Sequence, residues 1–190
     1  MALNPMSRVA RSVVLITATA AAVSAQSTPE PLSIARQGYL FAGGKYSNSN
    51  SAQVMSGQLY AEFQIPSKLA HPWPVVMIHG GSQSGTNFTG TPDGREGWAQ
   101  FFLRQGYAVY VVDQPGRGRA AYQASLYGTA APVNLENTQR RFAAPERFNL
   151  WPQAHLHTQW PAQGVPGDPT FDQFYASQVP SIENFRFSRN

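Results

Sequence analysis

The sequence has 190 residues, a length that predicts one domain. Hydrophobic residues make up 42% of the chain and charged residues 13%, which allows a packed core. The formal net charge is +4, but no run of five or more Lys/Arg residues occurs, which argues against nucleic-acid binding. Cysteine is absent, which excludes disulfides, cysteine catalysis and cysteine-ligated zinc.

The first residues have the pattern of a secretory signal peptide. Arg8 and Arg11 form a basic region, residues 13–23 form an apolar run, and residues 23–25 (VSA) form a small-residue cleavage site. The apolar run is shorter than the ~20 residues that cross a bilayer, so an export signal is favoured over a membrane anchor. The alternative is an apolar N-terminal helix. We expect cleavage after Ala25, removal of residues 1–25, and a secreted or periplasmic protein.

Two antiparallel strands are predicted at the start of the remaining chain. Residues 37–42 are short and aromatic, and Gly43-Gly44 after them predicts a turn. Residues 55–65 alternate between apolar and polar side chains up to Pro66, the pattern of a half-buried strand. The expected buried face carries Met55, Leu59, Ala61, Phe63 and Ile65.

A strand–helix–strand unit is predicted next. Residues 75–78 (VVMI) are continuously apolar, as expected of a strand covered on both faces, and residues 107–112 (YAVYVV) have the same character. Parallel strands joined through a helix place ligands at their carboxyl ends. We therefore expect any functional site to be built from the loops after Ile78 and Val112.

The helix between these strands is predicted from its ends. Asp93 and Glu96 have the three-residue spacing of a capping box, and Gly106 suits the position just after a helix. Its apolar face is expected to carry Trp98, Phe101 and Phe102.

The chain changes character after residue 120, so residues 26–120 are interpreted as the first half of the core. Residues 121–167 contain scattered aromatics and prolines but no sustained period, which favours a lid-like or cap-like insertion. In residues 168–190, Asp168-Pro169 resembles an N-cap with proline at the first helical position. A short helix with Phe171, Phe174 and Tyr175 should follow, and residues 181–187 are expected to begin another helix.

A glycine-rich loop after the first buried strand is the first candidate for chemistry. His79-Gly80-Gly81-Ser82 would let backbone N–H groups point into a cleft and hold a developing oxyanion. A phosphate-binding loop is disfavoured because neither a Walker A motif nor G-x-G-x-x-G is present. An ordinary turn remains an alternative.

The second candidate is Asp113-Gln114-Pro115-Gly116-Arg117-Gly118, after the next strand. H-G-G after one strand and D-x-x-G-x-G after the next, with TPDGREGW between them, resemble the α/β-hydrolase superfamily. Residues 75–119, together with stretches at 151–160 (WPQAHLHTQW) and after Gly167, are similar to secreted bacterial and fungal esterase-like hydrolases. The resemblance covers residues 36–187 and implies an α/β fold.

The resemblance also implies roles for individual residues. Gly81 and Ser82 would supply oxyanion-hole N–H groups. The loops would be structured by His79, Gly80, Asp113, Gly116 and Gly118. Asp113 is not interpreted as the triad acid, because in this fold the acid follows the nucleophile along the chain. Ala120 stands where the family commonly has serine, which removes one expected hydrogen bond of this loop.

The nucleophile of the family is missing. The sequence contains no G-x-S-x-G elbow, and no Ser-His-Asp/Glu triad can be assembled. We expect a carboxylic-ester hydrolase in its complete form, of which this chain is an inactive fragment ending before the nucleophile strand. The alternatives are a non-catalytic binding module or pseudoenzyme, and an epoxide hydrolase or dehalogenase on the same fold.

Neither a cofactor nor a metal is predicted. His155 and His157 lie two residues apart, but two ligands without a carboxylate make a poor metal site. The expected partner of the complete form is a small-molecule ester, with no nucleic acid and no membrane. The oligomeric state is left open.

Overall fold

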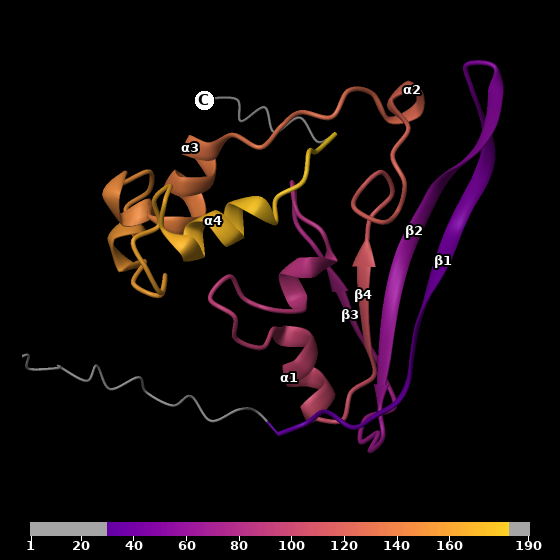
Figure 1. Ribbon diagram of the computed structural model, residues 1–190, viewed down its shortest axis with the longest axis horizontal. Helices are drawn as coiled ribbons and strands as arrows, with labels where there is room; N and C mark the ends of the chain where they lie inside the picture. Colours follow the sequence, from indigo (N-terminus) through magenta and orange to yellow (C-terminus); the bar gives the residue numbers. More distant parts are fainter. Residues whose placement is uncertain (1–29, 183–190) are drawn as a thin grey trace, which may run out of the picture. The chain divides into compact units, whose positions relative to one another are not determined.

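The computed structural model describes residues 30–182 (Figure 1). The chain divides into two compact units, Met1–Pro31 and Leu32–Asn190, and the described fold is that of the second. The predicted signal peptide and most of the helix expected over 181–187 lie outside the described residues. Within residues 30–182, none of the helices is long and apolar enough to cross a lipid bilayer.

Four strands form one mixed sheet: β1 (Ile34–Ser49), β2 (Ala52–Pro66), β3 (Val75–Ile78) and β4 (Val109–Asp113). Their order across the sheet is β1-β2-β4-β3. The pairs β1–β2 and β2–β4 are antiparallel, whereas β3 and β4 are parallel. A mixed sheet with helices confirms the predicted α/β class. It also places the ends of β3 and β4 at the same edge.

The predicted turn at Gly43-Gly44 is wrong. β1 runs on through both glycines, and the two-residue turn lies at Asn50-Ser51. Gly43 and Gly44 have φ angles of 70° and 87° inside the strand, and Gly57 of β2 has a φ of 76°. The pairing register is the same on both sides of these glycines, so their positive φ angles bend the hairpin without breaking it.

The burial pattern of β2 differs from the predicted alternation. Ala61 is buried as expected, but Met55 is 42% exposed while Ser56 and Gln58 are buried. The two-residue period continues from Ser56 to Gln58, and the buried face changes between Gln58 and Ala61, which are three residues apart. Polar side chains are therefore buried in the distal half of the hairpin, where Ser56 Oγ and Ser47 Oγ lie 2.7 Å apart.

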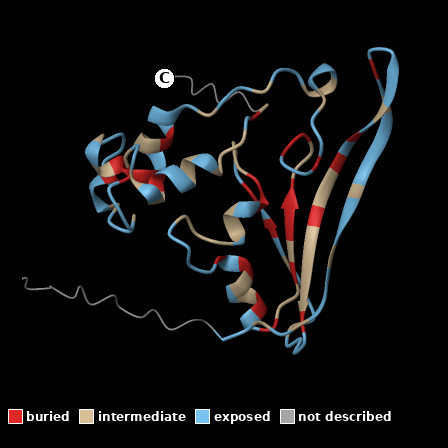
Figure 2. Cartoon of the chain, in the orientation of Figure 1, coloured by how far each residue is buried: buried red, intermediate tan, exposed pale blue. Residues whose placement is uncertain are grey.

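The strand β3 is not covered on both faces, as its apolar sequence predicted. Met77 is 5% exposed and belongs to the core, but Val76 and Ile78 are 54% and 61% exposed. β3 is the edge strand of the described sheet, and the core packs on one of its faces. Figure 2 shows buried positions on the strands and on helix α1 (Trp98–Arg104), and a second group in the short helices after β4. The core combines Met77, Ala99, Leu103, Val109 and Val111.

Helix α1 begins four residues later than the capping pattern predicted. Gly97 is its N-cap, and the Gly97 N–H donates to Gln100 Oε1 at 3.0 Å. A Cβ atom at Gly97 would lie 2.3 Å from the carbonyl oxygen of Phe88, so only glycine fits this cap. Asp93 instead accepts hydrogen bonds from Thr91 and Arg95 in the preceding loop.

The apolar face of α1 also differs from the prediction. Trp98 and Phe101 are 65% and 55% exposed, whereas Ala99 and Leu103 are buried. Of the predicted face, only Phe102 packs against the core, beside Ala99 and Leu103. The predicted end is confirmed: Gly106 has a φ of 83°, and its N–H donates to Leu103 O at 3.0 Å.

The chain after β4 contains several short helices separated by irregular segments. They are α2 (Ala124–Tyr127), α3 (Leu135–Thr138), the π-helix η2 (Gln139–Ala143), and the 3₁₀ helices η3 (Pro145–Arg147) and η4 (Ala154–Leu156). Another 3₁₀ helix, η1 (Gly85–Phe88), lies before α1. The boundaries of the predicted insertion stay a prediction.

Helix α4 (Pro169–Ala176) follows the sequence prediction closely. The Asp168 side chain accepts the Thr170 N–H at 2.9 Å, and Pro169 occupies the first helical position. Phe171 is fully buried. Phe174 meets the rings of Phe142 and Trp160 at centroid distances of 6.2 and 5.4 Å, which ties α4 to the short helices.

Candidate active-site loops

The loops that follow β3 and β4 are joined through His79. This side chain is 3% exposed, and its Nε2 accepts the Gln114 N–H at 3.1 Å. Because Nε2 accepts, the ring proton lies on Nδ1, which donates to Gly80 O at 2.9 Å. The side-chain amide of Gln114 donates a hydrogen bond from Nε2 to His79 O at 2.8 Å. Both ring nitrogens of His79 therefore form hydrogen bonds, and the Nε2 bond connects the two loops.

Asp113, at the end of β4, makes a second joint. Its carboxylate is 1% exposed. Oδ1 accepts the Gly85 N–H at 2.6 Å, and Oδ2 accepts the backbone N–H and Nε of Arg119 at 2.9 and 2.8 Å. Arg119 Nη1 also donates to Glu62 Oε2 at 2.6 Å, and the guanidinium lies over the Tyr60 ring. One carboxylate thus holds the start of η1 and the loop after β4 together.

Two glycines leave room for this carboxylate. A Cβ atom at Gly85 would lie 2.6 Å from Val111 Cγ1 and 3.1 Å from Asp113 Oδ1. A Cβ atom at Gly118, whose φ is 45°, would lie 2.6 Å from Asp113 Oδ2. The D-x-x-G-x-G spacing therefore has a steric reason at its last glycine.

The electrostatic balance at Asp113 favours its charged form. Burial by itself raises the pKa of Asp113, but hydrogen bonds from the side chain and backbone of Arg119 and from the Gly85 backbone outweigh burial, so this pKa lies below its ordinary value. For Arg119, desolvation lowers the pKa, and hydrogen bonds to Asp113 and Glu62 more than offset it. The pair is an ion pair at neutral pH.

Arg117 is the residue of this region that the sequence reasoning missed. It is 3% exposed, and its guanidinium donates to Gly80 O at 3.2 Å, to Gln83 O at 3.4 Å and to Ser181 Oγ at 2.9 Å. It therefore ties the glycine-rich loop to the chain after α4. The position of this arginine between two glycines directly after a buried strand was the available signal.

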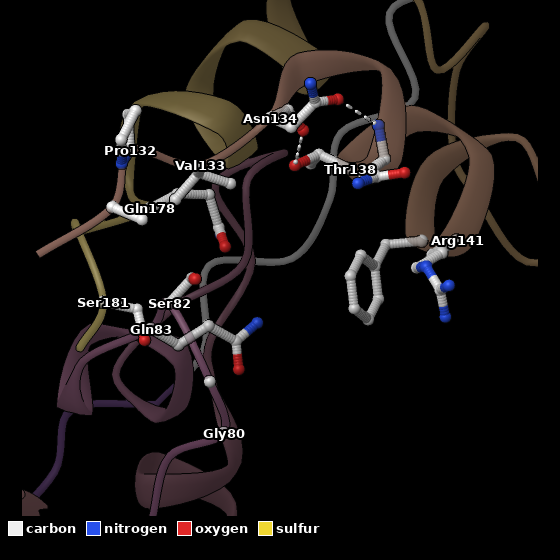
Figure 3. Close-up of a pocket in the computed structure, with 14 residues that line it drawn as sticks. Gly80, Ser82, Gln83, Pro132, Val133, Asn134, Thr138, Arg141, Gln178 and Ser181 are labelled. Atoms are coloured by element: carbon white, nitrogen blue, oxygen red, sulfur yellow. Dashed lines mark hydrogen bonds between the residues drawn. The ribbon is translucent and has the colours of Figure 1, made fainter. Parts of the chain in front are cut away.

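A pocket of about 380 Å³ lies beside the glycine-rich loop (Figure 3). Gly80, Gly81, Ser82 and Gln83 line one side of it. Ser82 is in the left-handed region with a φ of 58°, and Ser82 O accepts the Val179 N–H at 3.0 Å. The other lining residues are Ala131, Pro132, Val133, Asn134, Asn137, Thr138, Arg141, Phe142, Gln178 and Ser181.

The predicted site residues thus fall into two groups. Gly80, Gly81 and Ser82 line the pocket. The loop-structuring residues His79, Asp113, Gly116 and Gly118 do not line it. Gly116, with a φ of 77°, lies instead near Tyr127 and Ile182. Sequence reasoning did not identify the pocket wall formed by residues 131–142, because these short helices have no long-period pattern.

His155 and His157 contact different groups. His155 Nδ1 lies 2.9 Å from Pro152 O, and His157 Nδ1 lies 3.2 Å from Glu146 Oε2. The expectation that no carboxylate lies nearby is therefore wrong for His157. Within residues 30–182, no three His, Cys, Asp or Glu side chains come together in a group suited to a metal ion.

The sheet and the paired loops after β3 and β4 define an esterase-like hydrolase fold, as the sequence resemblance predicted. No protein-family model matches the chain. Over 141 residues, 74% of the chain, it is 45% identical to the "Probable secreted lipase phiG" of Fungal sp. (strain ATCC 74256).

Among solved structures, the chain is similar to a protein described as a novel bacterial esterase. The TM-score is 0.63 and the sequence identity 31%, covering 82% of this chain. The chain spans 36% of the length of the lipase and 53% of that of the esterase. The resemblance to esterase-like α/β-hydrolases is thereby confirmed for the part of those proteins that the chain spans.

Proposed function

We propose that the complete protein is a secreted carboxylic-ester hydrolase and that the loops described above form the oxyanion side of its active site. The identities to a lipase and an esterase support this class of reaction. The relative named a secreted lipase and the export pattern of residues 1–25 support secretion.

One observation carries the oxyanion assignment. Gly81 and Ser82 both line the pocket, and neither of their backbone N–H groups donates in the hydrogen bonds found among the described residues. Hydrogen bonds from His79 Nδ1 and Arg117 Nη1 to Gly80 O fix the loop that carries these N–H groups. Fixed backbone donors facing a pocket are what a tetrahedral intermediate requires, since they need not reorganise when charge develops.

In the proposed reaction, a serine oxygen attacks the ester carbonyl carbon and the carbonyl oxygen becomes the oxyanion. A histidine takes the serine proton during this attack, and it delivers that proton to the alcohol oxygen as the bond to this leaving oxygen breaks. Water cleaves the acyl-enzyme and releases the carboxylic acid. The 190 residues contain no G-x-S-x-G motif, so we propose that the serine and its base come from a part of the complete protein that its relatives also possess.

The test is turnover of short aryl esters by the complete protein, with and without a serine-directed phosphonate. Gly81→Pro removes the backbone donor, and Gly81→Ala keeps it as the matched control. Loss of one oxyanion donor typically lowers kcat by about 10²–10³. We expect that loss in Gly81→Pro and near-normal kcat in Gly81→Ala. Phosphonate-insensitive turnover, no turnover, or equal kcat in both variants would overturn the proposal.

Secretion is tested separately. We expect the mature protein in the culture medium or periplasm to begin at Gln26, because cleavage is predicted after Ala25. Amino-terminal sequencing measures this directly, and a protein retained in cells with residue 1 or 2 at its start would contradict it.

A further inference from the structure

Gln83 follows directly after the two residues proposed to supply the oxyanion donors. It lines the pocket together with Gly81 and Ser82, and it is half-buried. Its backbone is held, because Gln83 O accepts a hydrogen bond from Arg117 Nη1 at 3.4 Å. The side-chain carboxamide, by contrast, takes part in none of the hydrogen bonds found among residues 30–182.

The other carboxamides that line the pocket have different surroundings. Gln178 Nε2 donates to Phe174 O at 3.2 Å, and the Asn134 side chain caps helix α3. Asn137 is exposed on α3, within the opposite wall. A half-buried amide that the protein does not satisfy is available to a ligand. Among the lining carboxamides, the one on the glycine-rich loop, Gln83, therefore combines partial burial with a free donor.

The Gln83 side chain folds back over Gly80. A Cβ atom at Gly80 would lie 3.1 Å from Gln83 Oε1, which is tighter than most contacts of this kind. The φ angle of Gly80 is not in the left-handed region, so glycine is needed here for space rather than for its backbone conformation. In Figure 3 the amide nitrogen of Gln83 faces away from Gly80, into the space between the loop and the helices. Because Gly81 is bonded to Gly80, the carboxamide lies beside the proposed oxyanion donors.

We propose that Gln83 is a further catalytic residue, whose Nε2 donates a hydrogen bond to the ester carbonyl oxygen as that oxygen becomes the oxyanion. The inference rests on the proposed esterase function. Side-chain amides serve as oxyanion donors in the same way as backbone N–H groups. The hydrogen bond strengthens as negative charge develops on the oxygen, and no bond within Gln83 forms or breaks. Gly80 leaves the space in which this amide rests.

The test is steady-state hydrolysis of short aryl esters by the complete protein carrying Gln83→Met, which keeps the length of the side chain and removes the donor. An interaction made only in the transition state lowers kcat and kcat/KM equally and leaves KM unchanged. We expect kcat to fall about 10²-fold, with KM within about twofold of the wild-type value. Gln105→Met is the matched control, because Gln105 is exposed at the end of α1 and does not line the pocket. It should keep the wild-type kcat.

Gly80→Ala tests the position of the side chain without removing its amide. The new Cβ atom would press on Gln83 Oε1, so kcat should fall about tenfold as the donor is displaced. If Gly80 acts through Gln83, the double variant Gly80→Ala/Gln83→Met should be no slower than Gln83→Met alone. Losses that multiply in the double variant would overturn the role given to Gly80.

Chemical denaturation of each variant separates loss of the donor from loss of the fold. The Gln83 carboxamide has no hydrogen bond among the described residues, so the midpoint of unfolding should not change in Gln83→Met. If that variant does not fold, Gln83→Glu replaces it, because an ionised carboxylate also lacks a donor. Its kcat at neutral pH should be at least as low as that expected for Gln83→Met, since a negative charge opposes the oxyanion.

The outcomes separate this inference from the proposed function. Ester hydrolysis that Gly81→Pro removes, but that Gln83→Met leaves within about threefold of the wild-type kcat, would overturn the inference and keep the esterase function. A raised KM with unchanged kcat would also overturn it, because Gln83 would then bind the substrate and its transition state equally. Absence of turnover in the wild-type complete protein would overturn both.

Discussion

The two sides of the pocket are held by different kinds of interaction. The loop wall, residues 79–85, is fixed by the buried side chains of His79, Asp113 and Arg117. The helical wall, residues 131–142, depends on a backbone bridge between Ala131 and Ser181 and on the hydrogen bond from Tyr175 Oη to Val133 O. Buried charged groups with several partners fix a geometry, whereas short helices held at their ends can adjust. The loop wall, which we propose to be the oxyanion side, is therefore expected to be the more rigid of the two.

The largest effect is expected on the loop wall, from Asp113→Ala. This change removes three hydrogen bonds and leaves the Gly85 N–H and Arg119 without their buried acceptor. We expect a loss of about 3 kcal/mol in the free energy of unfolding, measured by chemical denaturation. The exposed Asp93→Ala serves as control and should cost under about 1 kcal/mol. Similar losses in both variants would remove the distinction between buried and exposed carboxylates.

The next largest effect is expected from Gly85→Ala, a loss of about 2 kcal/mol in the free energy of unfolding. The new Cβ atom would lie 2.6 Å from Val111 Cγ1 in the core, so the loop or the strand must move. Gly94→Ala is not the right control, because Gly94 has a φ of 83°, whereas Gly90→Ala meets its first neighbour only at 3.8 Å. A Gly85 variant as stable as the Gly90 variant would show that the loop wall adjusts after all.

Low pH should reduce the stabilisation that the Asp113 carboxylate gives to the loop wall. The folded pKa of Asp113 lies below its value of 3.8 in the unfolded chain, so its stabilisation is complete above about pH 4 and is lost as pH falls through the folded pKa. The free energy of unfolding should therefore fall more steeply between pH 5 and 2 in the wild-type protein than in Asp113→Asn. Parallel pH curves for the two proteins would contradict this cause.

The smallest effect is expected on the helical wall, from Asn134→Ala. The Asn134 side chain accepts the Asn137 N–H at 2.8 Å as the N-cap of α3, and losing a cap costs about 1 kcal/mol. We expect this small loss in the free energy of unfolding, measured by chemical denaturation, and a measurable change in the KM of the complete protein for short aryl esters. A larger loss than in Asp113→Ala would reverse the comparison of the two walls.

Local chemistry could be predicted from the sequence where it acts over a few residues. Asp168-Pro169 and Gly106 mark helix ends through their own side chains or lack of one, and both predictions are confirmed. The Asp93–Glu96 spacing failed because a close backbone approach between Gly97 and Phe88, the last residue of η1, fits a helix whose N-cap is Gly97. Such a contact has no signal in a short stretch of sequence.

Only the loop wall of the pocket could be predicted from the sequence. The glycines of residues 80–82 and Asp113 carry motif signals, and the structure brings their loops together. Arg117 has only its position between two glycines as a signal, and its partners follow from its burial. The pocket wall formed by residues 131–142 carries no motif signal, because it depends on the position of short helices. Even the continuous apolar run of β3 misled, since Val76 and Ile78 lie on a face that the described residues leave exposed.

The bent hairpin of β1 and β2 has a mechanical consequence. Beyond the segment that pairs with β4, its distal half reaches α2, where the Gly57 N–H donates to Tyr127 Oη at 2.6 Å and Ser49 Oγ bonds to Ser125 Oγ. The hairpin therefore supports the segment that leads to residues 131–142 through these two hydrogen bonds, although neither strand contributes a residue to the pocket lining.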